Sequence, residues 1–374
     1  MLFNRNRLNE LAASVGISEI GVTTAEPLEY MRKRLEKRVS EKRVTTFEEV
    51  NPEKRLSPSA LLDKCRSIVT LAIPYYRAGP TPPFSDDQPL GLVARCARSV
   101  DYHKIVEDRA DKLVKTLIRE VGSRFNYRIF TDRSPLLERE LSLNSGLGLI
   151  GENCTLINTR YGSYVALGTI LIDKPLETDS PSEPQACCSC GLCLKKCPTG
   201  ALIEPFIINP HLCLSYLTQS PGIFPRGLRA KLENRIYGCD RCQEICLYND
   251  NVEDSGLCEN AFHLFPGNPL LIPLLGISQK EFEMTIGLTS AGWRGKTTLQ
   301  RNVVIALGNS KYEGAIKKLR RLLENDPRPV IRLHAAWALG RIGGAKAKFA
   351  LDKSYQKDPD QSVRDEVSIT LGEL

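Results

Sequence analysis

Cysteine is the residue type with the clearest chemical use in this chain, because thiolates bind iron and zinc. The chain has 13 cysteines, and the first group follows the spacing C-x2-C-x2-C-x3-C with a proline directly after it. This run is typical of bacterial ferredoxins, in which it binds a [4Fe–4S] cluster and gives its last thiolate to a second cluster. The two groups consist of Cys187, Cys190, Cys193 and Cys197, and of Cys213, Cys239, Cys242 and Cys246.

The spacing therefore predicts two [4Fe–4S] clusters that exchange their fourth ligand. The predicted ligands of cluster 1 are Cys187, Cys190, Cys193 and Cys246, and those of cluster 2 are Cys197, Cys213, Cys239 and Cys242. Zinc is the alternative, but four cysteines in so short a run before a proline are an unusual zinc spacing. We expect no ligand role for Cys188, which is out of register. Such clusters carry electrons, so the organic chemistry must occur elsewhere in the chain.

The apolar pattern divides the 374 residues into three regions. It predicts an α+β chain, in which an N-terminal α/β domain over 1–178 precedes a ferredoxin-like domain over 179–265 and helical repeats over 266–374. The N-terminal domain lacks a G-x-G-x-x-G run and a P-loop, so a classical dinucleotide or ATP site is unsupported. Its expected elements are helices over 4–20, 101–121 and 136–145, and strands over 67–75, 127–131 and 164–172.

The C-terminal region repeats with a period of 32 residues. Ala-Leu-Gly at 306–308 and 338–340 becomes Thr-Leu-Gly at 370–372, which predicts a short HEAT-like stack. The net charge of +7 arises here, because 285–374 contains 16 Lys and Arg against 9 Asp and Glu. A basic repeat module favours a nucleic-acid partner. A structural cap or a dimer contact is the alternative.

The N-terminal residues contain early charges and no apolar stretch, so we expect neither a signal peptide nor a membrane anchor. Together with the reduced cysteines, this predicts a cytoplasmic protein, and the short charged repeat module predicts a monomer.

Several longer strings resemble the epoxyqueuosine reductase family, the cobalamin-dependent iron–sulfur enzymes of queuosine-tRNA synthesis, which are related to reductive dehalogenases. The resemblance runs through most of the chain and is much more specific than the cysteine spacing alone. The matching strings are EIGVTTAEP at 19–27, EKRLSP at 53–58, DYHKIV at 101–106, GLGLIGENCTLI at 146–157, CPTGAL at 197–202, LSYLTQ at 214–219, NRIYGCDRCQEIC at 234–246 and WRGKTTLQRN at 293–302.

The resemblance implies that the N-terminal domain binds cobalamin on a fold similar to that of the dehalogenases. The two clusters would then deliver electrons to cobalt, and the repeats would help to bind tRNA. The implied reaction removes the epoxide oxygen of epoxyqueuosine at the wobble position and gives queuosine. The external electron donor is not implied.

Asp132 matches the catalytic aspartate of the family and would donate a proton to the departing oxygen. As an acid at neutral pH it would need a raised pKa, which burial against the cofactor and the substrate would supply. From the residues alone, an aspartate before Arg-Ser-Pro would be a turn or a helix cap. Glu152 stands where the family commonly has lysine, which puts a cation at that point in doubt.

Further residues carry over as contacts. The cobalamin contacts implied by the resemblance are Arg55, Ala94, Asp132, Leu156, Leu167, Ser215, Gln219 and Asp240. The substrate contacts are Tyr102, Trp293, Arg294, Lys296 and Arg301, since an aromatic ring among cations can stack on a base while the cations meet phosphates. We expect His103 to form part of a polar wall of the site and not to bind cobalt. The structural alternatives are a surface ion pair for Arg55, core packing for the leucines and repeat packing for Trp293.

Two other functions remain open from the sequence. A corrinoid reductase of a small molecule, such as a dehalogenase, would have no use for a basic repeat module. A non-catalytic electron carrier would leave the N-terminal domain and Asp132 unexplained.

Overall fold

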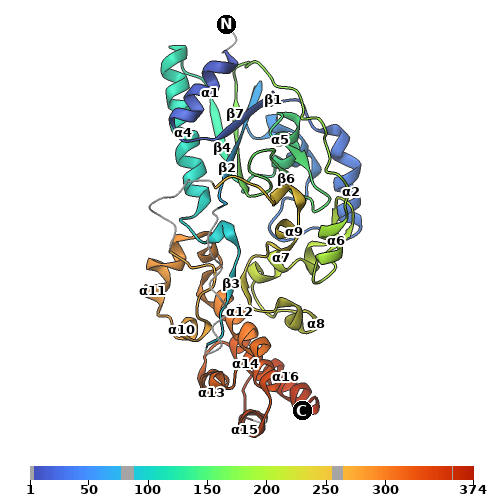
Figure 1. Cartoon of the computed structure of the whole chain (residues 1–374), viewed down its shortest axis with the longest axis vertical. Coiled ribbons are helices and arrows are strands. Elements are labelled where there is room, and N and C mark those ends of the chain that lie inside the picture. Colours follow the sequence, from blue (N-terminus) through green and yellow to red (C-terminus); the bar gives the residue numbers. More distant parts are fainter. Residues whose placement is uncertain (1–3, 77–87, 255–263, 356) are drawn as a thin grey trace. The chain divides into compact units, whose positions relative to one another are not determined.

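The computed structural model describes residues 4–76, 88–254, 264–355 and 357–374 (Figure 1). The chain forms two compact units, each built from several segments. Unit 1 contains Met1–Ala78, Asp101–Cys213 and Arg241–Glu259, and unit 2 contains Gly79–Val100, Leu214–Asp240 and Asn260–Leu374. These units do not follow the predicted boundaries at 178 and 265, because the cysteine-rich region contributes to both.

Unit 1 has helices on both faces of an antiparallel sheet, and this confirms the predicted α+β class. Its helices are α1 (Arg5–Ser14), α2 (Arg32–Ser40), α3 (Pro52–Leu56), α4 (Tyr102–Val121), α5 (Glu138–Asn144), α6 (Leu192–Lys196) and α9 (Arg241–Glu244). Its strands are β1 (Glu19–Thr24), β2 (Ser67–Pro74), β4 (Tyr127–Phe130), β5 (Leu149–Ile150), β6 (Leu156–Ile157), β7 (Val165–Ile172), β8 (Leu202–Glu204) and β9 (Ile207–Ile208).

The four-stranded sheet has the order β1-β2-β7-β4, with every neighbouring pair antiparallel. Its register aligns Val22 with Val69 and Val69 with Ile170, and all three side chains are fully buried. The central strands β2 and β7 are apolar along most of their length because both faces of the sheet are covered. Five of the six elements predicted in this region are present with ends that differ by at most two residues, whereas the helix predicted over 4–20 ends at Ser14 and is followed by β1 from Glu19.

Each face of the sheet has its own core. On one face α1 and α4 pack over the sheet (Figure 1). Leu8, Val106 and Leu113 of these helices are buried in one cluster with side chains of the strands. On the other face, residues of α2, α3 and α5 such as Leu35, Leu56 and Leu141 form a second cluster. The two cores hold the ends of β4, α4 and α5 in place relative to one another, and these are the elements that carry the site described below.

Unit 2 joins the helical repeats to two inserted segments. Its elements are β3 (Leu92–Val93), β10 (Arg235–Tyr237), α7 (Leu214–Gln219), α8 (Arg226–Arg229), α10 (Leu271–Leu275), α11 (Gln279–Met284), α12 (Gly295–Ser310), α13 (Ile316–Asn325), α14 (Pro329–Ile342), α15 (Ala345–Ser354) and α16 (Gln361–Gly372). Strands β3 and β10 pair in parallel. One continuous apolar core links β3, β10 and α7 to the repeats, which is why these segments belong to this unit.

The 32-residue repeat corresponds to close packing between successive helices. Gly308 of α12 faces α14, where an added Cβ would lie 2.8 Å from the Cα of Ala338. Gly340 of α14 faces α16 in the same way, and its Cβ would lie 2.0 Å from Cγ2 of Thr370. Glycine is therefore needed at these positions, because the next helix leaves no room for a side chain. The predicted helical repeat is confirmed.

The repeated Asp-Pro pair also has a structural use. Arg332 donates to the backbone carbonyl of Asp326 at 2.8 Å, and Arg364 donates to the carbonyl of Asp358 one repeat later. Arg332 additionally forms a buried ion pair with Asp358 at 2.7 Å. Part of the basic charge of the repeats is therefore used to fasten one repeat to the next.

Among the described residues, no helix combines the length and the apolar character needed to cross a bilayer.

We expect Gly308→Val to destabilise unit 2, since the added side chain must displace the backbone of α14. Overpacking of this kind typically costs about 1–3 kcal/mol, and a lower thermal midpoint measured by calorimetry would report it. Gly372→Val is the matched control, because Gly372 occupies the same repeat position but has no other heavy atom within 4 Å of an added Cβ. Equal midpoints for the two variants would contradict the packing argument.

Candidate functional site

The N-terminus of α4 presents three polar residues in a row. Asp101 is the N-cap, and its carboxylate accepts the backbone N–H of His103 at 3.2 Å. The same carboxylate is hydrogen bonded to Nδ1 of His103. The rings of Tyr102 and His103 are stacked, with centroids 4.2 Å apart. The DYH string thus forms a helix start whose capping residue also orients the imidazole.

Asp132 lies two residues after the end of β4, and its carboxylate meets this helix start. His103 Nε2 is 2.7 Å from Asp132 Oδ1, and the Tyr102 hydroxyl donates to Oδ2. The backbone of Asp132 is left-handed, with a φ of +42°, which non-glycine residues adopt at a cost. Its side chain is half exposed. Within unit 1 the carboxylate is paired with a histidine, and the burial of Asp132 against the cofactor and the substrate stays a prediction.

Glu138, the first residue of α5, holds the backbone of this loop. Its two carboxylate oxygens accept the backbone N–H of Asp132 at 3.1 and 3.0 Å. Burial and the neighbouring Asp132 carboxylate raise the pKa of Glu138 to about 8. Sequence reasoning missed this residue, because nothing in the string LERE distinguishes a glutamate that turns back to the preceding loop from one that faces solvent.

The imidazole of His103 carries an extra proton at neutral pH. Burial lowers the pKa of His103, but the hydrogen bonds to Asp101 and Asp132 and their charges outweigh burial and raise it to about 9. The imidazole is therefore cationic below that pH. His103 was expected only to form a polar wall, but its two ring nitrogens connect the carboxylates of Asp101 and Asp132.

Arg55 supports the same loop from the other side. Its guanidinium donates to the carbonyl of Pro135 at 3.3 Å and forms an ion pair with Glu48 at 3.0 Å. Burial lowers the pKa of Arg55, and the Glu48 carboxylate opposes this shift. The ion pair that was the structural alternative for Arg55 is present, and the hydrogen bond to Pro135 ties Arg55 to the loop that carries Asp132.

The cysteines predicted to bind cluster 1 line one cavity in unit 1, although Cys246 is far from the other three in sequence. The cavity is lined by Gly151, Glu152, Asn153, Ile157, Cys187, Cys188, Cys190, Leu192, Cys193, Cys246, Leu247 and Tyr248. Among the described residues, no three His, Cys, Asp or Glu side chains are grouped to hold one metal ion. A four-iron cluster makes a different demand, because each thiolate binds its own iron.

Glu152 organises the cysteine loop. Its backbone N–H points to Sγ of Cys187 at 3.3 Å, and its buried carboxylate accepts the backbone N–H of Gly191 at 3.0 Å. The glutamate that departs from the family pattern therefore has a local use, which is to shape the turn between the first cysteines.

The cysteines predicted for cluster 2 are divided between the units. Cys197, Cys213 and Cys242 belong to unit 1 and Cys239 to unit 2. Burial raises the pKa of Cys197, but hydrogen bonds from the backbone N–H groups of Leu202, Thr199 and Ala201 outweigh it and lower the pKa. This environment favours the thiolate that iron requires. The division of ligands between the two clusters stays a prediction.

Four of the predicted cobalamin contacts lie in unit 2, around β10 and α7. The Asp240 carboxylate accepts the backbone N–H of Arg95 at 2.7 Å. Ala94 packs closely on Gly238, since a Cβ added to Gly238 would lie 2.4 Å from the Cβ of Ala94. The Gln219 amide donates to the carbonyl of Ser215 at 2.9 Å. In unit 1, Leu156 and Leu167 share one apolar cluster. Their cofactor contacts stay predictions.

On unit 2, the exposed ring of Trp293 is paired with the partly buried guanidinium of Arg294. The Trp293 side chain is half exposed, and the Arg294 guanidinium lies 3.7 Å from the centre of its ring. Trp293 Nε1 donates to Oε1 of Gln219 at 2.9 Å, which fixes the plane of the indole. Lys296 reaches the carbonyl of Ile277 at 3.5 Å. This arrangement is suited to stacking a nucleic-acid base.

Arg301 does not belong to this exposed surface, and the predicted substrate contact is wrong. Its side chain is 1% exposed, and its guanidinium donates to the carbonyls of Leu217, Ser220 and Gly222 at the end of α7. Without the Arg301 guanidinium these buried carbonyls would be left unpaired. The sequence shows that Arg301 is charged but not that it is buried.

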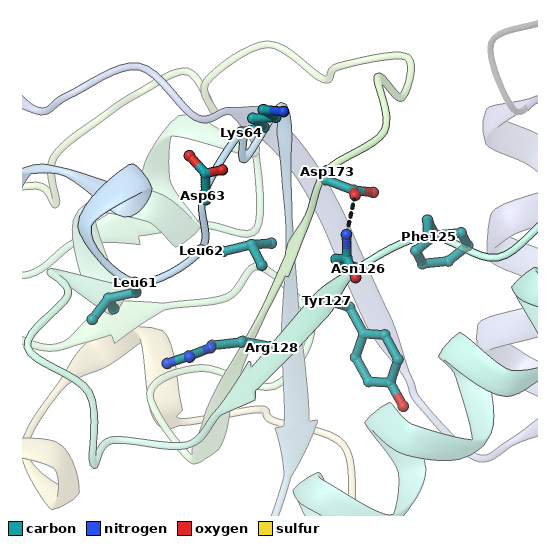
Figure 2. Close-up of a pocket in the computed structure, with 9 residues that line it drawn as sticks. All are labelled: Leu61, Leu62, Asp63, Lys64, Phe125, Asn126, Tyr127, Arg128 and Asp173. Carbon is teal, nitrogen blue, oxygen red and sulfur yellow. Dashed lines mark hydrogen bonds between the residues drawn. The ribbon is translucent and has the colours of Figure 1, made fainter.

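A second, larger pocket of unit 1 lies at the opposite end of β4 from Asp132. It has a volume of about 560 Å³ and is lined by Leu61, Leu62, Asp63, Lys64, Phe125, Asn126, Tyr127, Arg128 and Asp173 (Figure 2). Two of the lining residues are hydrogen bonded to each other, since the Asn126 amide donates to the Asp173 carboxylate at 2.8 Å. None of the predicted site residues lines this pocket, and we assign it no chemistry.

Three family models match separate parts of the chain. They describe epoxyqueuosine reductase QueG over residues 55–133, a 4Fe-4S double cluster binding domain over 186–249 and HEAT repeats over 295–372. The chain is 36% identical over 372 residues to an epoxyqueuosine reductase of Bacillus subtilis (strain 168), covering 97% of this chain and 94% of that one. It is 37% identical to one of Bacillus anthracis, covering 95% and 93%.

Solved structures of epoxyqueuosine reductases match the whole fold. A selenomethionine-labelled crystal structure aligns with a TM-score of 0.91 at 36% identity, covering 99% of this chain and 98% of that one. A complex with an epoxyqueuosine-modified stem loop of tyrosine tRNA aligns at 0.90 with the same identity and coverage. A Bacillus subtilis structure in which the catalytic aspartate loop is swung out of the active site aligns at 0.89, again with 36% identity and 99% and 98% coverage.

We expect Glu138→Ala to loosen the loop over 131–137, because the backbone N–H of Asp132 loses both of its acceptor oxygens. Loss of such hydrogen bonds costs about 1–3 kcal/mol, so amide exchange in a peptide over 130–137, measured by mass spectrometry, should accelerate about tenfold or more. Glu138→Gln keeps one carbonyl acceptor and should show a smaller effect. Unchanged exchange in Glu138→Ala would mean that other contacts hold the loop.

Proposed function

This chain belongs to the epoxyqueuosine reductase family, and we propose that it reduces epoxyqueuosine to queuosine at the wobble position of tRNA. Near-full-length similarity to curated and solved epoxyqueuosine reductases is the observation that carries the proposal. A solved relative is bound to an epoxyqueuosine-modified tRNA stem loop, which supports tRNA as the partner. We place the activity in the cytoplasm, where tRNA is processed.

Two [4Fe–4S] clusters would supply the electrons. The matched double-cluster region contains all eight predicted ligands, and the cavity shared by Cys187, Cys190, Cys193 and Cys246 suits the first cluster. Cys197, Cys213, Cys239 and Cys242 would hold the second. An external protein or small-molecule reductant must reload the clusters.

Cobalamin would be held by residues of two kinds. Leu156, Leu167 and Ala94 offer apolar or small surfaces that suit the faces of a macrocycle, and the close approach of Ala94 to Gly238 leaves little bulk there. Arg55, Ser215, Gln219 and Asp240 offer polar groups that suit its amide periphery. When bound, low-valent cobalt supplies a strong reductant that no side chain provides.

The chain's own residues manage the proton and the substrate. Conversion of an epoxide to an alkene releases its oxygen as water, which consumes two electrons and two protons. Asp132 is a suitable donor because its half-exposed carboxyl lies on a fixed loop, and the Tyr102 hydroxyl orients one of its oxygens. Trp293 and Arg294 would stack on a base of the tRNA, and Lys296 would meet a phosphate.

The experiment that tests the proposal is anaerobic turnover of iron-reconstituted protein on epoxyqueuosine-containing tRNA, with and without cobalamin. Mass spectrometry of the digested nucleosides should show loss of one oxygen only when cobalamin is present. Asp132→Asn should lower turnover about 10²-fold or more while iron content and cobalamin binding stay unchanged. Cobalamin binding without conversion would favour a corrinoid reductase of a small molecule, and no cobalamin binding would favour an electron carrier.

The ligand assignment can be tested separately by iron content. Cys187→Ala should remove the first cluster and with it about four irons per chain. Cys188→Ala is the matched control, because Cys188 is adjacent in sequence and lines the same cavity but is not a predicted ligand. An iron content that falls in Cys188→Ala and not in Cys187→Ala would reverse the assignment.

A further inference from the structure

The carboxylate that would donate the proton is the outer end of a short hydrogen-bonded chain. Asp101 accepts from Nδ1 of His103, and Nε2 of His103 is 2.7 Å from Oδ1 of Asp132. Both ring nitrogens therefore face carboxylates, which is the arrangement that suits a doubly protonated imidazole. The His103 side chain is 13% exposed, whereas that of Asp132 is 50% exposed. The histidine is thus the sheltered partner and the aspartate the one that faces outward.

This arrangement matters because the reaction consumes protons. A single carboxylic acid is exhausted after one transfer and must be recharged before it can act again. With substrate bound over it, the exposed side of Asp132 would be covered, so a proton supplied from within the protein would have an advantage over one from bulk water.

We propose that His103 is the proton reservoir that recharges Asp132, an inference that rests on the proposed function. Protonated Asp132 gives its proton to the epoxide oxygen as the carbon–oxygen bond breaks, and becomes a carboxylate. The proton on Nε2 of His103 then passes to Oδ1 of Asp132, which restores the acid and leaves a neutral imidazole that solvent reprotonates. His103 acts through Asp132 and is therefore a positioning and proton-supplying residue.

The other titratable groups around the pair are less suited to this role. Glu138 bonds the backbone N–H of Asp132 and not its carboxylate. Arg133 lies 3.9 Å from Asp101, and a guanidinium does not release its proton in proteins. The Tyr102 phenol meets Asp132 directly, but phenols ordinarily titrate near pH 10. Because two carboxylates raise the pKa of His103 to about 9, the imidazole holds its proton at neutral pH and loses it above that pH.

The test is the pH dependence of single-turnover reduction by the full holoenzyme on modified tRNA. Reduced methyl viologen is the reductant, because its potential does not change with pH. The wild-type rate should fall about tenfold per pH unit above about 9. His103→Gln keeps an amide that can hydrogen bond Asp132 but carries no transferable proton, so its rate should be about 10²-fold lower at neutral pH and should lack this alkaline fall.

Two further variants separate proton supply from a structural role. Added imidazole should restore turnover in His103→Ala but not in His103→Gln, where the cavity is filled. Tyr102→Phe removes another hydrogen bond to the same carboxylate and should keep the alkaline fall. A His103→Gln rate profile that matches the wild type would overturn the relay alone, whereas no wild-type turnover would overturn the proposed function and the relay together.

A readout without turnover follows from the small number of histidines. The chain has four, so nitrogen-15 imidazole resonances of the holoenzyme can be assigned by substitution. One should titrate with a midpoint near 9 and move to a lower midpoint in Asp132→Asn, which removes one of the two carboxylates. A midpoint near the ordinary value of about 6.5 in the wild type would overturn the proposal even if His103→Gln failed to fold.

Discussion

The site of unit 1 depends on the left-handed backbone of Asp132, whose carboxylate is half exposed. Residues with side chains adopt this conformation only when their surroundings compensate for it. Here the compensation comes from Glu138, which binds the backbone N–H of Asp132, and from Arg55, which binds the carbonyl of Pro135. The supports belong to α5 and α3, and β4 leads into the loop. Because α3 and α5 pack on one face of the sheet that contains β4, the loop takes its shape from this core.

The loop that carries the first cysteines, over 186–197, is organised differently, by backbone hydrogen bonds and not by a large apolar core. Ile150 forms a bridge to Ala186 at its start, and the N–H of Cys187 donates to the carbonyl of Ile150 at 3.2 Å. Glu152 then binds the turn at Gly191. Short helices and tight turns leave cysteine side chains converging on one cavity. Such a segment gains much of its stability when its ligands are bound by metal.

The sequence predicted the long elements of unit 1 well, because apolar spacing over β2, β7 and α4 reports the burial of those elements directly, but it did not predict β1 or α2. It also predicted that Cys246 would join the first three cysteines, since the ferredoxin spacing encodes a long-range contact. It could not predict the role of Glu138, which depends on the left-handed turn of Asp132. Nor could it separate Arg301, which is buried against backbone carbonyls, from Arg294 nearby. Charge is readable from a sequence, but the burial of a single charged residue is set by tertiary packing.

The hydrogen bond between Trp293 and Gln219 has a consequence for how the protein can be observed. The chain has only two tryptophans. Trp337 is 4% exposed within the repeats, whereas Trp293 is 49% exposed and held in a fixed plane. The ultraviolet emission of the protein therefore combines a shielded background with one solvent-facing indole. A molecule that binds against Trp293 changes the emission of Trp293 and not that of Trp337. The fluorescence of the protein therefore reports whether the surface at Trp293 is occupied.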